Sequence, residues 1–72
     1  MTEDRQSWTC EHFSLTNPLG SAEQSDVAAL LRRVASQLEE IGPIDVADLV
    51  LHNEITDDGE NWPSITVYFS RP

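Results

Sequence analysis

The longest regular hydrophobic pattern in the chain lies between Ser21 and Gly42. Its apolar residues recur at steps of three or four, which places them on one stripe of an α-helix: Val27, Leu30, Leu31, Val34, Leu38 and Ile41. We therefore expect one long helix over about residues 21–41. Its apolar stripe needs a sheet or another helix to cover it.

Side-chain chemistry marks both ends of this helix. Ser21 and Gln24 have the spacing of a capping box, whereas Ser25 or Asp26 would cap a shorter helix. At the other end, Gly42 can take the left-handed conformation that closes a helix, and the proline after it cannot continue one. The end is therefore better defined than the start.

Three other segments alternate apolar and polar residues, which is typical of half-buried strands. They cover about residues 7–15, 45–56 and 62–70. The acidic turn around Asp58 and Gly59 joins the last two as a hairpin. The chain is therefore expected to be a single α+β domain over residues 1–72 with the element order β-α-β-β, in which residues 1–6 form a disordered tail.

The register of the hairpin follows from side-chain parity, because opposed residues in an antiparallel pair share a face. We favour the register in which Leu51 faces Ile65, Leu49 faces Val67 and Ala47 faces Phe69, with a loop from Thr56 to Glu60. A shift by two residues would set Asn53 against Ile65 in the core, where an unpaired amide costs roughly 1–3 kcal/mol.

A right-handed crossover makes the first two strands parallel, and the third strand then has two possible places. It inserts between them in the order 1-3-2 or lies outside in the order 3-2-1. We prefer 1-3-2, because Ile65, Val67 and Phe69 form the most uniformly apolar face and suit the centre under the helix.

Composition narrows the classes of partner. Thirteen acidic residues against four basic ones give a net charge of −9, which disfavours binding to nucleic acid or to an anionic membrane surface. Cys10 is the only cysteine, so no disulfide framework forms. We expect a cytoplasmic protein with neither a secretory signal nor a membrane span.

One helix covers one face of a three-stranded sheet and leaves the other face open. By the alternation above, the open face carries most of the chemically interesting residues: Trp8, Cys10, His12, Val46, Val50, His52, Glu54, Thr66 and Tyr68. An apolar and aromatic second face on so small a core favours self-association into a homodimer or a larger assembly. A small-molecule pocket on this face is the alternative.

Two chemical interpretations of the open face compete with self-association. Cys10-x-His12 and His52-x-Glu54 contain zinc-ligand types, but in the order 1-3-2 their strands lie about 9–10 Å apart, too far to share one ion without reaching across the third strand. In the order 3-2-1 the two strands adjoin and a metal site becomes possible. In an enzyme, His12 or His52 would act as a base, with Glu54 orienting it and Tyr68 donating a proton. We expect neither a metal nor a cofactor, and keep the enzyme as the alternative function.

In element order and length the chain resembles the dodecins, small β-α-β-β proteins that assemble into hollow dodecamers and bind flavin. The shared local detail is Asp58-Gly59 in the hairpin. Where that family has a flavin-stacking tryptophan, this chain has Asp45 and Val46, and the family's glutamine has no counterpart in residues 64–70. The resemblance therefore implies assembly but not flavin binding.

Overall fold

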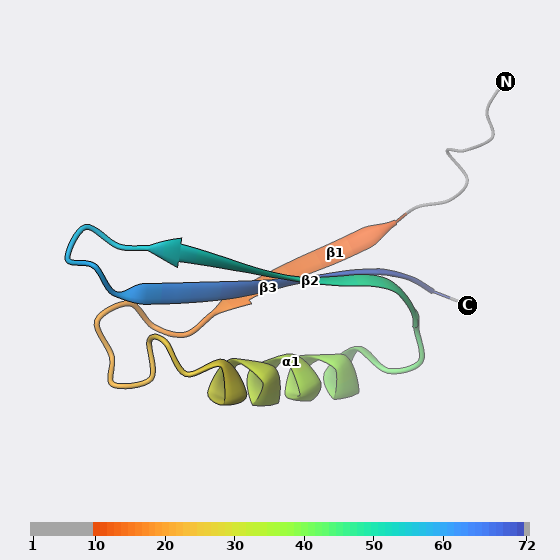
Figure 1. Cartoon of the computed structure of the whole chain (residues 1–72). Coiled ribbons are helices and arrows are strands. Elements are labelled where there is room, and N and C mark those ends of the chain that lie inside the picture. The colour runs from red at the N-terminus through yellow and green to blue at the C-terminus, as the bar shows by residue number, and fades with distance from the viewer. Residues whose placement is uncertain (1–9, 72) are drawn as a thin grey trace, which may run out of the picture.

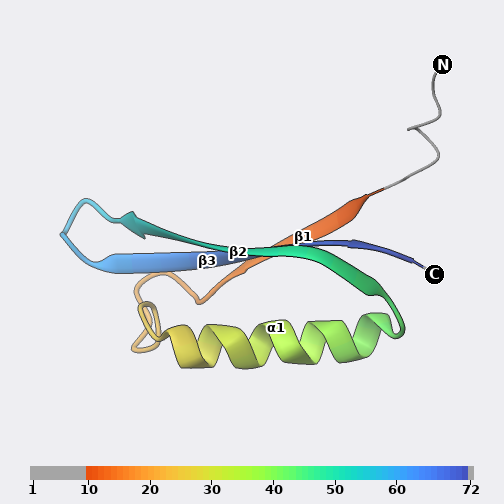
Figure 2. The ribbon, with the colours of Figure 1, turned by 45° about the vertical axis from the view of Figure 1, so that its right-hand side comes forward.

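The structure, a computed structural model, describes residues 10–71 of the chain. It contains four elements in the order β-α-β-β: β1 (Glu11–Thr16), α1 (Val27–Ile41), β2 (Asp45–Ile55) and β3 (Asn61–Ser70). The helix runs along one face of a three-stranded sheet, and no element covers the other face in this part of the chain (Figures 1 and 2). The predicted α+β fold is confirmed.

The strand order is β1-β3-β2, as the apolar character of the third strand predicted. Both outer strands are antiparallel to β3, so β1 and β2 run in the same direction. The helix-side residues of β3, namely Ile65, Val67 and Phe69, are buried. Residues 7–9 of the predicted first strand lie outside the described residues, and β1 ends one residue later than expected.

The helix begins at Val27, six residues after the predicted start at Ser21. Asp26 is the N-cap, and its carboxylate accepts a hydrogen bond of 3.1 Å from the backbone N–H of Ala29. The capping box does not form, because the Gln24 side chain accepts instead from Gly20 N–H. Residues 21–25 are consequently turns, and the shorter of the two predicted helices is the correct one.

The helix ends where the sequence predicted. Gly42 has a φ of 93°, which glycine adopts without a steric penalty, and its N–H donates to the carbonyl of Leu38. The chain then turns back into β2, whose first residues rise from the end of the helix to the edge of the sheet (Figure 2).

The hairpin register is as predicted from Asp48 to Ile55, with Leu51 opposite Ile65 and Leu49 opposite Val67. The predicted pair of Ala47 with Phe69 is wrong. An irregularity between Val46 and Asp48 adds one residue to β2, so Val46 faces Phe69. Because paired residues share a face, Val46 lies on the helix side and not on the open face where the alternation placed it.

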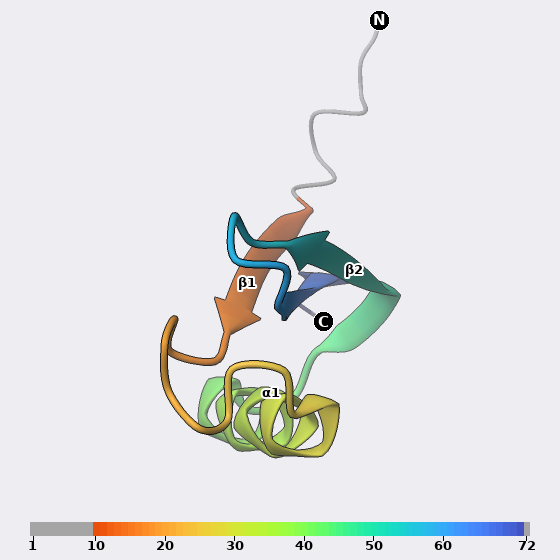
Figure 3. The ribbon, with the colours of Figure 1, turned by 60° about the vertical axis from the view of Figure 1, so that its left-hand side comes forward.

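The helix covers β1 and β3 but not β2. Leu30 and Val34 are buried against β3, whereas α1 and β2 make no backbone contact along their described lengths. Figure 3 looks along the helix and shows β1 on one side of the sheet and β2 on the other. Leu49 and Leu51, expected beneath the helix, are 44% and 48% exposed because the only helix described lies over the other two strands.

Candidate functional site

On the open face, paired residues of the three strands form rows that run across the sheet. The register aligns His12, Tyr68 and Asp48 in one row and Ser14, Thr66 and Val50 in the next. His52 opposes Ser64 and Glu54 opposes Trp62 toward the hairpin loop. The face therefore carries more hydrogen-bonding groups than apolar side chains.

Side chains of β1 and β3 contact one another on this face. The rings of His12 and Tyr68 lie 5.7 Å apart between centroids with a tilt of 36°. In the next row, the hydroxyls of Ser14 and Thr66 share a hydrogen bond of 2.6 Å. These contacts hold side chains of β1 and β3 in place. The residues of β2 are exposed along the whole strand.

The four residues of the enzyme interpretation do not converge. His12 contacts Tyr68, and His52 lies 3.6 Å from Glu54 between Nε2 and Oε2. The row of Ser14, Thr66 and Val50 lies between the row of His12 and Tyr68 and the row of His52. Both members of the His52–Glu54 pair are about two-thirds exposed, so water screens their interaction. A substrate atom at one pair would be out of reach of the other.

The remaining predicted site residues do not extend these pairs. Cys10 is exposed, with its Sγ 3.9 Å from the carbonyl oxygen of Glu11, and Trp8 lies outside the described residues. Within residues 10–71, no group of three or more histidine, cysteine or carboxylate side chains has the geometry of a metal site.

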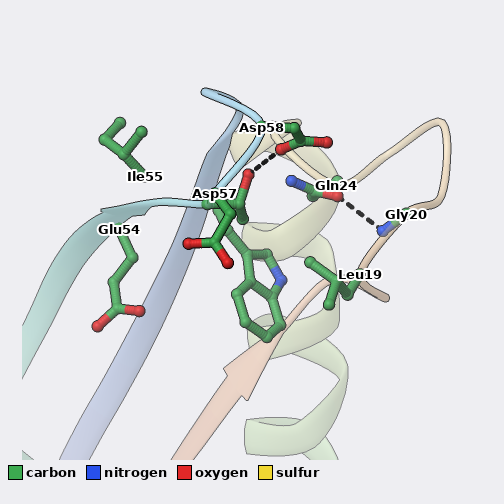
Figure 4. A pocket seen from close by; sticks show the side chains of 9 residues that line it. Leu19, Gly20, Gln24, Glu54, Ile55, Asp57 and Asp58 are labelled. Carbon is green, nitrogen blue, oxygen red and sulfur yellow. Dashed lines mark hydrogen bonds between the residues drawn. The ribbon is translucent and has the colours of Figure 1, made fainter.

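A hollow of about 560 Å³ lies beside the hairpin loop, where the alternation predicted no site. Leu19 and Trp62 provide apolar lining, and Glu54, Asp57 and Asp58 provide carboxylates. Figure 4 shows the labelled residues Leu19, Glu54, Asp57 and Asp58 at the hollow. The Thr56 hydroxyl donates a hydrogen bond to Asp58 and lowers the pKa of that carboxyl. The hollow is thus acidic at neutral pH and would favour cations over anions.

Asn17 anchors the segment that forms one wall of this hollow. It is fully buried, and its Nδ2 donates to the carbonyls of Glu23 and Asp26 at 2.7 and 2.9 Å. The backbone carbonyl of Asn17 accepts a hydrogen bond of 2.9 Å from Trp62 Nε1. The sequence offered only a weak signal for this role, because Asn17 precedes a proline and such pairs are common in turns.

An exposed apolar surface lies on the helix side, where α1 leaves β2 uncovered. We call it the uncovered patch and define it by five residues: Val27, Leu31, Val46, Leu49 and Leu51. Each is between 38% and 48% exposed. Strand alternation correctly assigned Leu49 and Leu51 to the helix side of the sheet. The helical periodicity placed Leu31 in the same core stripe as Leu30, but Leu31 is 47% exposed, because one helix is too narrow to cover all three strands.

No helix in the described part of the chain is long and apolar enough to cross a membrane. Comparisons with protein-family models, with curated proteins and with solved structures gave no match to this chain.

Proposed function

We propose that this protein is a non-catalytic interaction module that works by associating with copies of itself. The observation that carries the proposal is β2, an edge strand of eleven residues that is exposed on both faces. Apolar side chains lie on each side of it, with Leu49 and Leu51 toward the helix and Val50 on the open face. A monomer would leave these side chains and the strand's outer backbone groups in water.

The size of the effect sets the expected affinity. Burying the exposed half of a leucine or valine side chain contributes about 1 kcal/mol to association. The five residues of the uncovered patch, taken from each of two copies, would therefore contribute roughly 10 kcal/mol. Association costs about 4–15 kcal/mol in lost rigid-body freedom and side-chain order. At the lowest cost the net gain is about 6 kcal/mol, so we expect a reversible assembly with a dissociation constant of tens of micromolar or weaker.

The enzyme alternative has less support. Catalysis by His12 or His52 needs groups that converge on one reacting atom, and Tyr68 and Glu54 serve different histidines. The cytoplasm is the setting that we propose, because a reducing compartment keeps the exposed thiol of Cys10 free.

Sedimentation equilibrium over a series of micromolar concentrations tests the proposal. We expect the average mass to rise with concentration from the 8.1 kDa of one chain toward at least twice that value. A mass that stays at one chain up to the highest concentration would contradict self-association.

A further inference from the structure

We infer that the uncovered patch, and not the open face, is the surface on which a second copy of this chain binds. The inference rests on the proposed self-association and specifies where it occurs. In the contact that we describe, the exposed flank of α1 in one copy lies over the uncovered side of β2 in the other. A two-fold axis repeats the same contact in the opposite direction.

The helix carries a second apolar flank that its own sheet does not use. Leu31 lies about 100° around the helix from the fully buried Leu30, on the flank opposite the buried Ala29. Two small residues, Ala28 and Ala35, continue this flank and are also exposed. The apolar stripe of α1 is therefore wider than the part that contacts β1 and β3.

The helix-side surface of β2 is the matching half of the contact. Val46, Leu49 and Leu51 lie on this side because they oppose the buried residues of β3. They form a strip one strand wide with no helix over it, and α1 is the only helix in the described chain. Each copy carries both the helix flank and the strand strip. In a two-fold dimer, the flank of each copy can therefore cover the strip of the other.

Charge selects this surface for contact between identical chains. Each copy carries a net charge of −9, so two copies repel unless the contacting surfaces lack carboxylates. The uncovered patch contains no ionisable side chain. The open face, by contrast, carries Asp48 and Glu54, so a face-to-face contact would bring two copies of these carboxylates into one interface.

The available area agrees with a dimer of modest affinity. The five half-exposed side chains present roughly 400 Å² in each copy, which is within the range of the largest apolar patch on a monomer. Two such patches, with the alanines of the helix flank and the polar rim, approach the roughly 1,000 Å² that a specific interface needs.

Neighbouring residues of β2 provide a matched test. Leu51→Glu and Val50→Glu make the same change in charge on adjacent residues with exposures of 48% and 42%, but on opposite faces of the strand. Leu31→Glu places the same charge on the helix flank and serves as a second patch variant. Circular dichroism of each variant verifies that the fold is kept, and sedimentation equilibrium measures the association.

We expect Leu51→Glu and Leu31→Glu each to raise the dissociation constant at least tenfold, while Val50→Glu changes it less than twofold. If assembly persists in both patch variants, or if only Val50→Glu disrupts it, this interface is wrong although the proposed self-association stands. A parent protein that is monomeric at every concentration overturns both proposals.

Discussion

Asn17 and Trp62 show how single polar groups organise the hairpin end of the molecule. Asn17 joins the turn before α1 through its side chain and binds the indole of Trp62 through its backbone. Without these bonds the fully buried Asn17 amide would have no partner for its N–H groups, at a cost of about 1–3 kcal/mol, and the partly buried indole N–H would lose its acceptor. These bonds therefore connect the segment before the helix to the start of β3, although 45 residues separate Asn17 from Trp62.

Glu11 and Arg71 form the corresponding connection at the other end of the sheet. Arg71 donates two hydrogen bonds to the carboxylate, from Nε at 2.8 Å and from an Nη atom at 3.2 Å. Hydrogen bonding by Arg71 lowers the pKa of Glu11 below its ordinary value of about 4.5. The pair joins β1 to the chain end that follows β3.

This ion pair predicts a pH dependence. Because the pKa of Glu11 is lower in the folded protein than in the unfolded chain, its contribution to stability is present above about pH 4.5 and is lost as the pH falls through the lowered value. Urea unfolding of the parent and of Glu11→Gln should therefore differ at pH 7 and converge in acid. A difference that stays constant down to pH 3 would contradict the assignment.

At the scale of elements, the position of α1 on the sheet gives two neighbouring leucines different exposures to solvent. Leu30 is fully buried and Leu31 is 47% exposed. We expect Leu30→Ala to lower the free energy of unfolding by roughly 2–5 kcal/mol, and Leu31→Ala by about 1 kcal/mol or less. Urea titrations at concentrations dilute enough to keep the chain monomeric measure both, and equal losses would show that the helix lies differently on the sheet.

The sequence predicted the element types, the strand order and most of the hairpin register, because these depend on local periodicity and on side-chain parity. It could not predict the lateral position of the helix. Leu30 and Leu31 belong to the same stripe, and only three-dimensional packing decides which of them faces β3. Likewise, nothing in the residues around Ala47 signals the irregularity that turns Val46 toward the helix side.

The start of α1 was ambiguous for a different reason. Gln24 had two available uses, as the partner of Ser21 in a capping box or as a bridge to distant backbone. Gln24 forms the bridge, because its Nε2 donates a hydrogen bond of 3.2 Å to the backbone carbonyl of Asn61 in β3. A tertiary contact across 37 residues thus overrides the local capping pattern.

The same limit applied to the candidate site. Alternation predicts which residues share the open face, and the register places His12, Thr66 and Tyr68 on one face as the alternation requires. Alternation cannot show convergence, however, and β3 lies between the two histidines. The hollow beside Trp62 was missed because it forms between the hairpin and the segment around Leu19, which are far apart in the sequence.

At the scale of the whole molecule, the net charge opposes both folding and association. Acidic groups on a chain this small repel one another, and salt screens this repulsion over about 10 Å at 0.1 M. The proposed interface is apolar and uncharged, so salt weakens the repulsion between copies without breaking any ion pair across the contact. Folding and self-association should therefore respond to salt in the same direction.

We expect the melting temperature to rise and the dissociation constant to fall when sodium chloride is increased from about 20 to about 200 mM. The ion pairs between residues 10 and 71 do little to oppose this trend. They lie at the exposed surface, as Arg33 with Glu23 at 3.9 Å does, and screening costs little there. Thermal melts and sedimentation equilibrium at the two salt concentrations measure the two quantities on one sample.

A melting temperature that falls with salt would mean that attractive ion pairs outweigh the repulsion of the acidic chain. A dissociation constant that rises with salt would mean that charged groups hold the copies together, which the uncharged patch could not do.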